Sequence, residues 1–211
     1  KNGKYGIKGL PAVYAEENEA QTLEICLEDP VTKVRVILLY GVLPEYDVIT
    51  RSVTVINGGS DPVTLEKIQT ACLDFVSGDY DLIQFYGRHA MERNMQRTPI
   101  AHGAQVIGSR RGTSSHQYNP FMIIAGNGTD EDHGSCYGMS FVYSGNFKGE
   151  AEKDQFNQTR VSMGLQDELF EYMLLPGEIF EAPEVVLSYS RKGLSALSRN
   201  YHRVYRQHLC R

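Results

Sequence analysis

Residues 22–43 read TLEICLEDPVTKVRVILLYGVL. Apolar or β-branched side chains alternate with polar ones over residues 22–28 and again over 33–43, which is the pattern of half-buried strands. Between these runs, Asp29-Pro30-Val31-Thr32 is a turn signal, because proline presets φ and an Asp side chain can bond to the backbone that follows it. Strands joined by so short a turn run antiparallel, so this stretch predicts a β-hairpin and an all-β fold.

The same signals recur along the rest of the chain. We expect further strands over residues 47–56, 63–75, 80–86, 104–107, 121–125, 136–143, 147–156, 159–165 and 182–189. The apolar face shifts within residues 63–75, which predicts a bulge or a bend in that strand. Near-minimal connections such as Ser144-Gly145-Asn146 make neighbouring strands antiparallel. Roughly ten or more short strands of this kind predict a large sandwich of two antiparallel sheets.

The C-terminal residues depart from the β pattern. After Gly193, apolar and aromatic side chains recur at helical spacing: Leu194, Leu197, Tyr201, Val204, Tyr205 and His208. This spacing predicts an amphipathic helix that runs to the end of the chain. Arg199, Arg203 and Arg206 fall on its other side, where a solvated basic face near a helix C-terminus is the ordinary interpretation.

Composition sets limits on function. The 211 residues fit one β domain with its own core, and a net charge of -5 gives no sign of a nucleic-acid partner. No stretch is apolar enough for a signal peptide or a membrane span.

The four cysteines include no CxxC pair, as expected of free thiols, and a cytoplasmic location is the simpler interpretation. The chain has no P-loop, dinucleotide or nucleophile-elbow motif, so we expect no cofactor.

The most polar stretch is residues 107–121, IGSRRGTSSHQYNPF. Its side chains offer the planar donors and acceptors that grip hydroxyls or carboxylates. They are two guanidiniums (Arg110, Arg111), an imidazole (His116), two amides (Gln117, Asn119) and a phenol (Tyr118). Two interpretations stay open on the residues alone. Either this is a ligand site that the flanking apolar runs hold at a sheet end, or it is a turn whose hydroxyls bond its own backbone and whose arginines pair with acidic neighbours.

A second candidate is the loop predicted over residues 86–94. Arg88, His89, Glu92 and Arg93 lie here, between two β runs. Such a loop is either a tip that reaches another site or an ordinary connection. In the second case its charges pair in solvent, where an exposed ion pair contributes roughly 0 to 1 kcal/mol.

Two acidic groups contain the residue types of functional sites. Residues 130–133 (DEDH) lack the late Glu of a calcium loop and the second Cys or His pair of a zinc site, so we expect a solvated loop and no metal. Asp74, Asp79 and Asp81 have the chemistry of glycosidase carboxylates. Their place around a Ser-Gly pair favours turn formation instead.

Several separated blocks of the sequence are similar to one protein family. In chain order they are residues 9–12 (GLPA), 16–27 (EENEAQTLEICL), 47–52 (DVITRS), 109–117 (SRRGTSSHQ), 119–121 (NPF), 138–147 (GMSFVYSGNF), 160–164 (RVSMG), Glu178 and 183–186 (PEVV). Together they resemble the N-terminal β-supersandwich domain of glycoside hydrolase family 36, the bacterial and fungal α-galactosidases. The resemblance runs nearly end to end.

The resemblance implies a galactose-mutarotase-like β-supersandwich over residues 1–192, with further N-terminal strands of the family domain preceding Lys1. It also implies a linker helix over residues 193–211 that leads toward an absent (β/α)8 barrel. In the family, that barrel holds the aspartate nucleophile and the aspartate acid/base that hydrolyse melibiose, raffinose and similar α-galactosides with retention. Because no residue here matches those barrel strands, we assign no catalytic residue to this chain and expect it to be inactive alone.

The resemblance implies partners as well. The family's supersandwich packs on its own barrel and, in tetramers, lends loop residues to a neighbouring subunit's sugar pocket. Residues 87–93 align with that contributed hairpin, so the resemblance places Arg88, His89, Glu92 and Arg93 at the rim of the substrate site. Many relatives have a tryptophan near the position of His89, where this chain offers only a weaker hydrogen-bonding contact. The polar loop is then expected to fix the domain against the barrel or a partner subunit, through Arg110, Arg111, His116 and Gln117.

Two other functions stay open. One is a stand-alone carbohydrate-binding module that uses Arg110, His116 and Gln117 as a lectin site. The other is a mutarotase or epimerase, which needs a His and a Glu that converge on one concave face.

Overall fold

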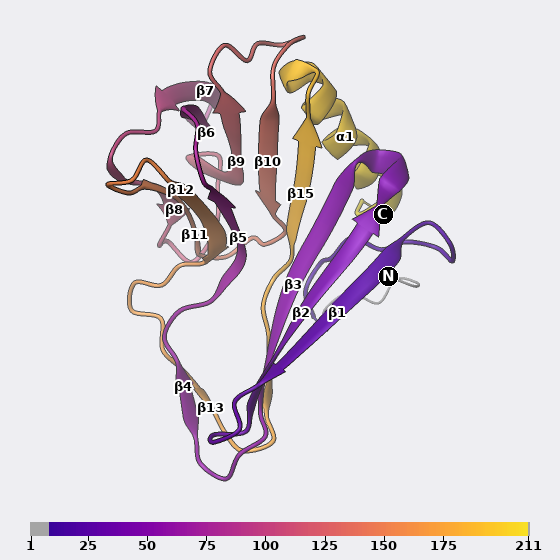
Figure 1. Ribbon diagram of the computed structural model, residues 1–211, viewed down its shortest axis with the longest axis vertical. Coiled ribbons are helices and arrows are strands. Elements are labelled where there is room, and N and C mark those ends of the chain that lie inside the picture. Colours follow the sequence, from indigo (N-terminus) through magenta and orange to yellow (C-terminus); the bar gives the residue numbers. More distant parts are fainter. Residues whose placement is uncertain (1–8, 211) are drawn as a thin grey trace.

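The computed structural model describes residues 9–210, which form fifteen strands, a short 3₁₀ turn and one helix (Figure 1). The two ends of the predicted domain, Lys1 and Arg211, lie outside the described residues. The elements are β1 (Gln21–Glu28), β2 (Val34–Leu43), η1 (Pro44–Tyr46), β3 (Val48–Asn57), β4 (Val63–Leu65), β5 (Gln69–Phe75), β6 (Tyr80–Arg88), β7 (Met91–Pro99), β8 (Gly103–Ser109), β9 (Tyr118–Gly126), β10 (Cys136–Phe141), β11 (Phe147–Lys153), β12 (Thr159–Leu165), β13 (Tyr172–Leu174), β14 (Ile179–Glu181), β15 (Val185–Ser190) and α1 (Gly193–His208).

One broad antiparallel sheet forms the larger layer. Its strands run in the order β1-β2-β3-β15-β10-β9-β6-β7, and β14 also pairs with β3. The hairpin predicted from residues 22–43 is confirmed as β1 and β2. The Asp29 carboxylate accepts the backbone N–H groups of Val31 at 3.2 Å and Thr32 at 3.1 Å, which is the local bonding that favours Asp at a turn.

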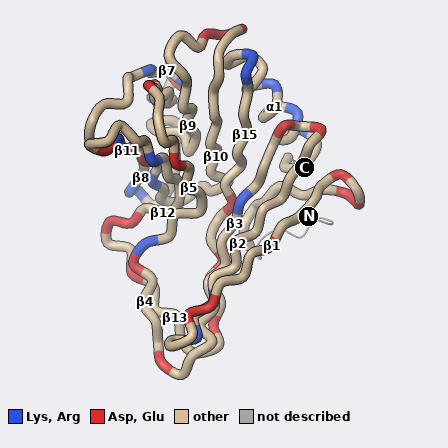
Figure 2. The backbone as a smooth tube through the Cα atoms, viewed as in Figure 1, with Lys and Arg blue, Asp and Glu red and all other residues tan. Residues whose placement is uncertain are grey.

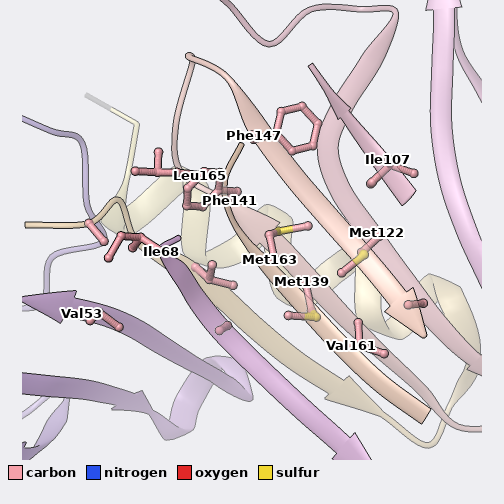
Figure 3. Packing of buried hydrophobic residues seen from close by; sticks show 14 of the residues in the cluster. Val53, Ile68, Ile107, Met122, Met139, Phe141, Phe147, Val161, Met163 and Leu165 are labelled. Atoms are coloured by element: carbon pink, nitrogen blue, oxygen red, sulfur yellow. The ribbon is translucent and has the colours of Figure 1, made fainter. Parts of the chain in front are cut away.

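A smaller layer covers part of one face of this sheet. It consists of the β11-β12-β5 sheet, with β8 packed beside β11. Between the layers, Met122, Met139, Met163 and Phe147 are fully buried (Figure 3), and flexible methionines fill the irregular space that unequal layers leave. The predicted sandwich of antiparallel sheets is therefore confirmed. A separate two-stranded ribbon of β4 and β13 extends from one end of the molecule (Figure 1).

Helix α1 covers the opposite face of the large sheet. Leu197, Tyr201 and Val204 are buried there in a second apolar cluster, as the helical spacing predicts. The helix begins at Gly193, which has φ +69° and where an added Cβ would stand 2.6 Å from the carbonyl oxygen of Asp130. Basic residues follow one another along the outer side of α1 (Figure 2).

Two of the predictions from sequence are wrong. Residues 63–75 do not form one bent strand, because β4 pairs with β13 whereas β5 pairs with β12. The chain changes partner at Ile68, which is buried and whose carbonyl accepts the N–H of Leu165 at 3.0 Å. The loop predicted over residues 86–94 is a hairpin. Its second strand, β7, is exposed on both faces, so its sequence carries no apolar alternation.

Candidate functional site

The β6–β7 hairpin carries the first candidate site at its tip. The strands pair as far as Arg88 and Met91, which leaves His89 and Ala90 as the two turn residues. Ala90 adopts φ 61°, and its N–H donates to the Glu92 carboxylate at 3.0 Å. This bond stabilises a left-handed turn conformation that alanine rarely adopts by itself.

The hairpin is closely packed near its tip and is fixed to its surroundings at its base. At Gly87 an added Cβ would stand 2.4 Å from the carbonyl oxygen of Met91, so only glycine lets the strands approach there. Further back, Arg97 Nε donates to Asp81 Oδ2 at 2.6 Å, and Arg97 Nη1 donates to the carbonyl of Thr129 at 2.5 Å. Although β7 is an edge strand, it is therefore tied to β6 and to the loop after β9.

The four side chains that the resemblance places at a sugar rim all lie at this tip. Arg88, His89, Glu92 and Arg93 are exposed. Arg88 Nη2 lies 3.1 Å from the sulfur of Met91, and the Glu92 carboxylate bonds only to backbone. Within residues 9–210 none of the four forms an ion pair, so their hydrogen-bonding groups stay available to an external partner.

The second candidate site is the loop of residues 110–117 between β8 and β9. Its backbone is anchored to the turn that follows β10: the N–H of Gly112 donates to Asn146 Oδ1 at 2.6 Å, and the N–H of Ser114 donates to the carbonyl of Ser144 at 2.8 Å. Ser109 Oγ closes the loop on itself by donating to the carbonyl of Thr113 at 2.6 Å. These bonds hold the loop in one conformation.

The two arginines of this loop have hydrogen-bond partners within the described residues. Arg110 pairs with Glu168 and Arg111 bonds to the amide oxygen of Gln117, as expected of a turn with paired arginines. Arg110, Arg111 and His116 nevertheless stay exposed. Each guanidinium has five donors, and these contacts leave most of them free to bind another molecule.

The two candidate sites meet at one end of the large sheet. Strand β6 lies between β7 and β9, and Tyr86 is the cross-strand partner of both Asn94 and Tyr118. Tyr86 is 42% exposed and Tyr118 is 45% exposed. Both tyrosines lie in stretches that the sequence marks as candidates, residues 86–94 and 107–121, but their adjacency depends on which strands pair. The hairpin tip and the polar loop therefore flank a row of exposed side chains.

Three hollows of the surface lie elsewhere. Among the described residues, one of about 560 Å³ lies beside Phe170 and one of about 270 Å³ lies beside Arg160. A third, of about 410 Å³, is an apolar groove lined by residues such as Leu187, Tyr137 and Tyr189. None of the three is lined by the candidate residues. The groove has no His or Glu in its lining, so it lacks the pair that a mutarotase needs.

The acidic loop of residues 130–133 supports the start of α1. The carbonyl of Asp130 accepts the N–H of Leu194 at 3.0 Å, and the carbonyl of Glu131 accepts the N–H of Ser195 at 2.9 Å. Backbone N–H groups of Asp132 and His133 hold the pKa of the Asp130 carboxyl below its usual range. The loop thus satisfies amide groups that a helix N-terminus leaves without partners.

Three aspartates lie in β5, in β6 and in the turn between these strands. Asp74 takes two hydrogen bonds from Arg160, at 2.7 and 3.2 Å, which lower the pKa of its carboxyl. Asp79 accepts from Lys153 at 3.0 Å, and Asp81 bonds to Arg97. Each of the three carboxylates therefore bonds to a different cation.

Comparison with known proteins identifies the family of this chain. The model of the glycosyl hydrolase family 36 N-terminal domain matches residues 1–175. The chain belongs to glycoside hydrolase family 36. A family 36 relative, the bifunctional α-galactosidase/sucrose kinase AgaSK of Mediterraneibacter gnavus, is 64% identical over 211 residues, which are 100% of this chain and 23% of AgaSK. The α-galactosidase AgaA of Geobacillus stearothermophilus is 45% identical over 99% of this chain and 29% of AgaA.

Solved structures of family 36 share the fold. The galactosidase domain of AgaSK superposes with a TM-score of 0.96 at 64% identity, over 100% of this chain and 29% of that one. AgaA gives the same TM-score at 45% identity, over 99% of this chain and 29% of that one. This chain therefore spans about a quarter of the length of these family 36 relatives. No helix within residues 9–210 is long and apolar enough to cross a membrane.

Proposed function

We propose that this chain is the non-catalytic N-terminal domain of an α-galactosidase, whose separate barrel hydrolyses terminal α-galactosides such as melibiose and raffinose with retention. The observation that carries the proposal is how much of each protein the alignment covers. Nearly all of this chain aligns with proteins named α-galactosidases, but the alignment spans only 23% to 29% of the length of those proteins. AgaA variants have been crystallised with stachyose and with raffinose. Residues 1–192 are then the supersandwich, and residues 193–211 are the helix that leads to the barrel, the domain's first partner.

The tip of the β6–β7 hairpin borders the sugar site in this proposal. Arg88, His89, Glu92 and Arg93 are exposed on a hairpin whose base is fixed, and the structure leaves them without ion pairs within residues 9–210. Guanidinium, imidazole and carboxylate groups of this kind bind sugar hydroxyls through directed hydrogen bonds. A fixed base matters because a site must hold its groups close to the productive geometry.

The polar loop serves as an interface in the same proposal. Arg110, Arg111, His116 and Gln117 project from a backbone that is already ordered, so docking costs little conformational entropy there. The partner is the barrel or another subunit of a homotetramer.

The cysteines favour a reducing compartment. All four are free, and Cys26, Cys72 and Cys210 are exposed. Exposed thiols persist where glutathione and thioredoxin keep them reduced, so we place the parent enzyme in the cytoplasm.

The test compares the full-length parent enzyme with residues 1–211 on p-nitrophenyl α-galactoside. The parent should turn over the substrate, whereas the fragment should not, with circular dichroism showing that the fragment has its β structure. Turnover by the folded fragment would refute the proposal. Calorimetric binding of galactose or melibiose by the fragment, lost in Arg111→Ala and His116→Ala, would favour a stand-alone carbohydrate-binding module instead.

A further inference from the structure

We propose that Tyr86 and Tyr118 form an aromatic platform that stacks against a hexose ring of the substrate beyond the galactose being released. The platform would favour longer oligosaccharides over substrates with no second ring. This inference rests on the proposed function, because it names what the hairpin end of the domain contacts.

The pairing of β6 with β9 places the two tyrosines at opposed positions of the sheet. Tyr86 on β6 and Tyr118 on β9 are cross-strand partners, and side chains at such positions point to the same face about 5 Å apart at their Cβ atoms. Both positions lie at the end of the strands where the hairpin tip and the polar loop begin. A ring presented here is therefore next to Arg88 on one strand and Gln117 on the other.

Both tyrosine rings are partly exposed at this end of the sheet. Tyr86 and Tyr118 are 42% and 45% exposed, and no aromatic contact or hydroxyl hydrogen bond involves them within residues 9–210. Tyr137 and Tyr189 on the same sheet show the contrast, because their ring centroids lie 4.8 Å apart with the rings tilted by 34°, and the Tyr189 hydroxyl lies 3.2 Å from Ser135 Oγ. Exposed tyrosines without internal partners are unusual for packing residues and typical of a contact surface.

The neighbouring polar groups suit a sugar. Asn94 continues the row on β7, and its Nδ2 donates to the carbonyl of Met91 at 2.8 Å, which fixes the amide and leaves Oδ1 free to accept a hydroxyl. Sugar rings present apolar C–H faces and hydroxyl edges, so a ring face with an amide beside it matches both parts. No hollow among the three described lies here, so the platform supplies one wall and the rest of the enzyme supplies the others.

The experiment uses the full-length parent enzyme and measures kcat/KM for stachyose and for α-galactosyl fluoride, which has no second ring. In Tyr86→Ala and Tyr118→Ala, the stachyose-to-fluoride ratio of kcat/KM should fall about 3- to 10-fold, the size of an aromatic contact, and mainly through KM. Because both substrates are assayed on one preparation, partial misfolding cancels from the ratio. Tyr86→Phe should keep most of the ratio, because stacking needs the ring and not the hydroxyl.

Phe156→Ala is the matched control, since Phe156 is 72% exposed in the turn between β11 and β12 and should leave the ratio unchanged. An unchanged ratio in both tyrosine-to-alanine variants would overturn the platform, as would an equal loss in Tyr86→Phe. If the wild-type parent hydrolyses neither substrate, the proposed function itself fails, so the two failures are distinguishable.

Discussion

Gly138 of β10 lies directly against the ring of Tyr201 on α1. A Cβ added to Gly138 would stand 2.6 Å from Tyr201 Cε2 and 2.7 Å from its hydroxyl oxygen. The ring cannot retreat, because its hydroxyl donates to the carbonyl of Val186 at 3.0 Å and Phe121 meets it edge-on at 5.1 Å. The absence of a side chain at Gly138 is what lets the helix pack on the sheet.

Replacing this glycine should therefore destabilise the domain. We expect Gly138→Ala to lower the free energy of unfolding by about 1 to 3 kcal/mol, the usual cost of overpacking a core. Gly126→Ala is the control, because the nearest atom to its added Cβ is at 3.4 Å. Denaturant titrations give both values, and equal losses in the two variants would contradict the role of Gly138.

Stability should fall in alkaline solution because of buried tyrosines. Burial raises the pKa of Tyr205 to about 12, against the opposing effect of its hydrogen bond with Ser140. Burial also raises the pKa of Tyr201 well above its usual value. An unfolded tyrosine titrates near about 10. Between those values the unfolded chain has released protons that the native chain keeps, so the free energy of unfolding falls as pH rises.

Tyr205→Phe should make that fall shallower, because it removes one group that titrates only on unfolding. Denaturant titrations from pH 8 to pH 11 measure the slope. Tyr189→Phe serves as the comparison, since a hydrogen bond from Ser135 lowers the pKa of Tyr189 and its loss should not reduce the slope. A slope unchanged by Tyr205→Phe would show that Tyr205 does not carry the effect.

Thiol labelling should distinguish the buried cysteine from the exposed ones. Burial raises the pKa of the Cys136 thiol to about 11, and the reactive species is the thiolate. At pH 8 iodoacetamide should modify Cys26 and Cys210, which are exposed, and should reach Cys136 only after unfolding. Peptide mass spectrometry identifies each site, and native labelling of Cys136 as fast as that of Cys26 would be inconsistent with the buried environment.

Arg111→Ala tests the interface role of the polar loop. Within residues 9–210 the Arg111 side chain bonds only to Gln117 and the residue is exposed. The free energy of unfolding of the domain itself should therefore fall by no more than about 1 kcal/mol. In the full-length enzyme, sedimentation should show weaker assembly, while Arg35→Ala on the exposed side of β2 should not. A loss of kcat in an oligomer that stays intact would point instead to a role in the chemical step.

Local sequence determined most of the elements of this protein. The alternation in residues 22–43 and the Asp29 turn specify β1 and β2, and the spacing of Leu197, Tyr201 and Val204 specifies the buried face of α1. Such patterns depend on neighbours within a few residues, so the strands and the helix can be predicted from the amino-acid sequence alone. The ordered blocks along the chain identified the family by the same local information.

Tertiary structure decided which of those elements meet. Only strand pairing divides residues 63–75 between two sheets, places Tyr86 beside Tyr118, and brings Glu168 to Arg110. Pairing and register arise from contacts between residues far apart in the chain, and β7 carries no apolar alternation in its sequence that would reveal it. The sequence by itself therefore determined the strands, the helix and the family, whereas the site at the end of β6, β7 and β9 exists only through their packing.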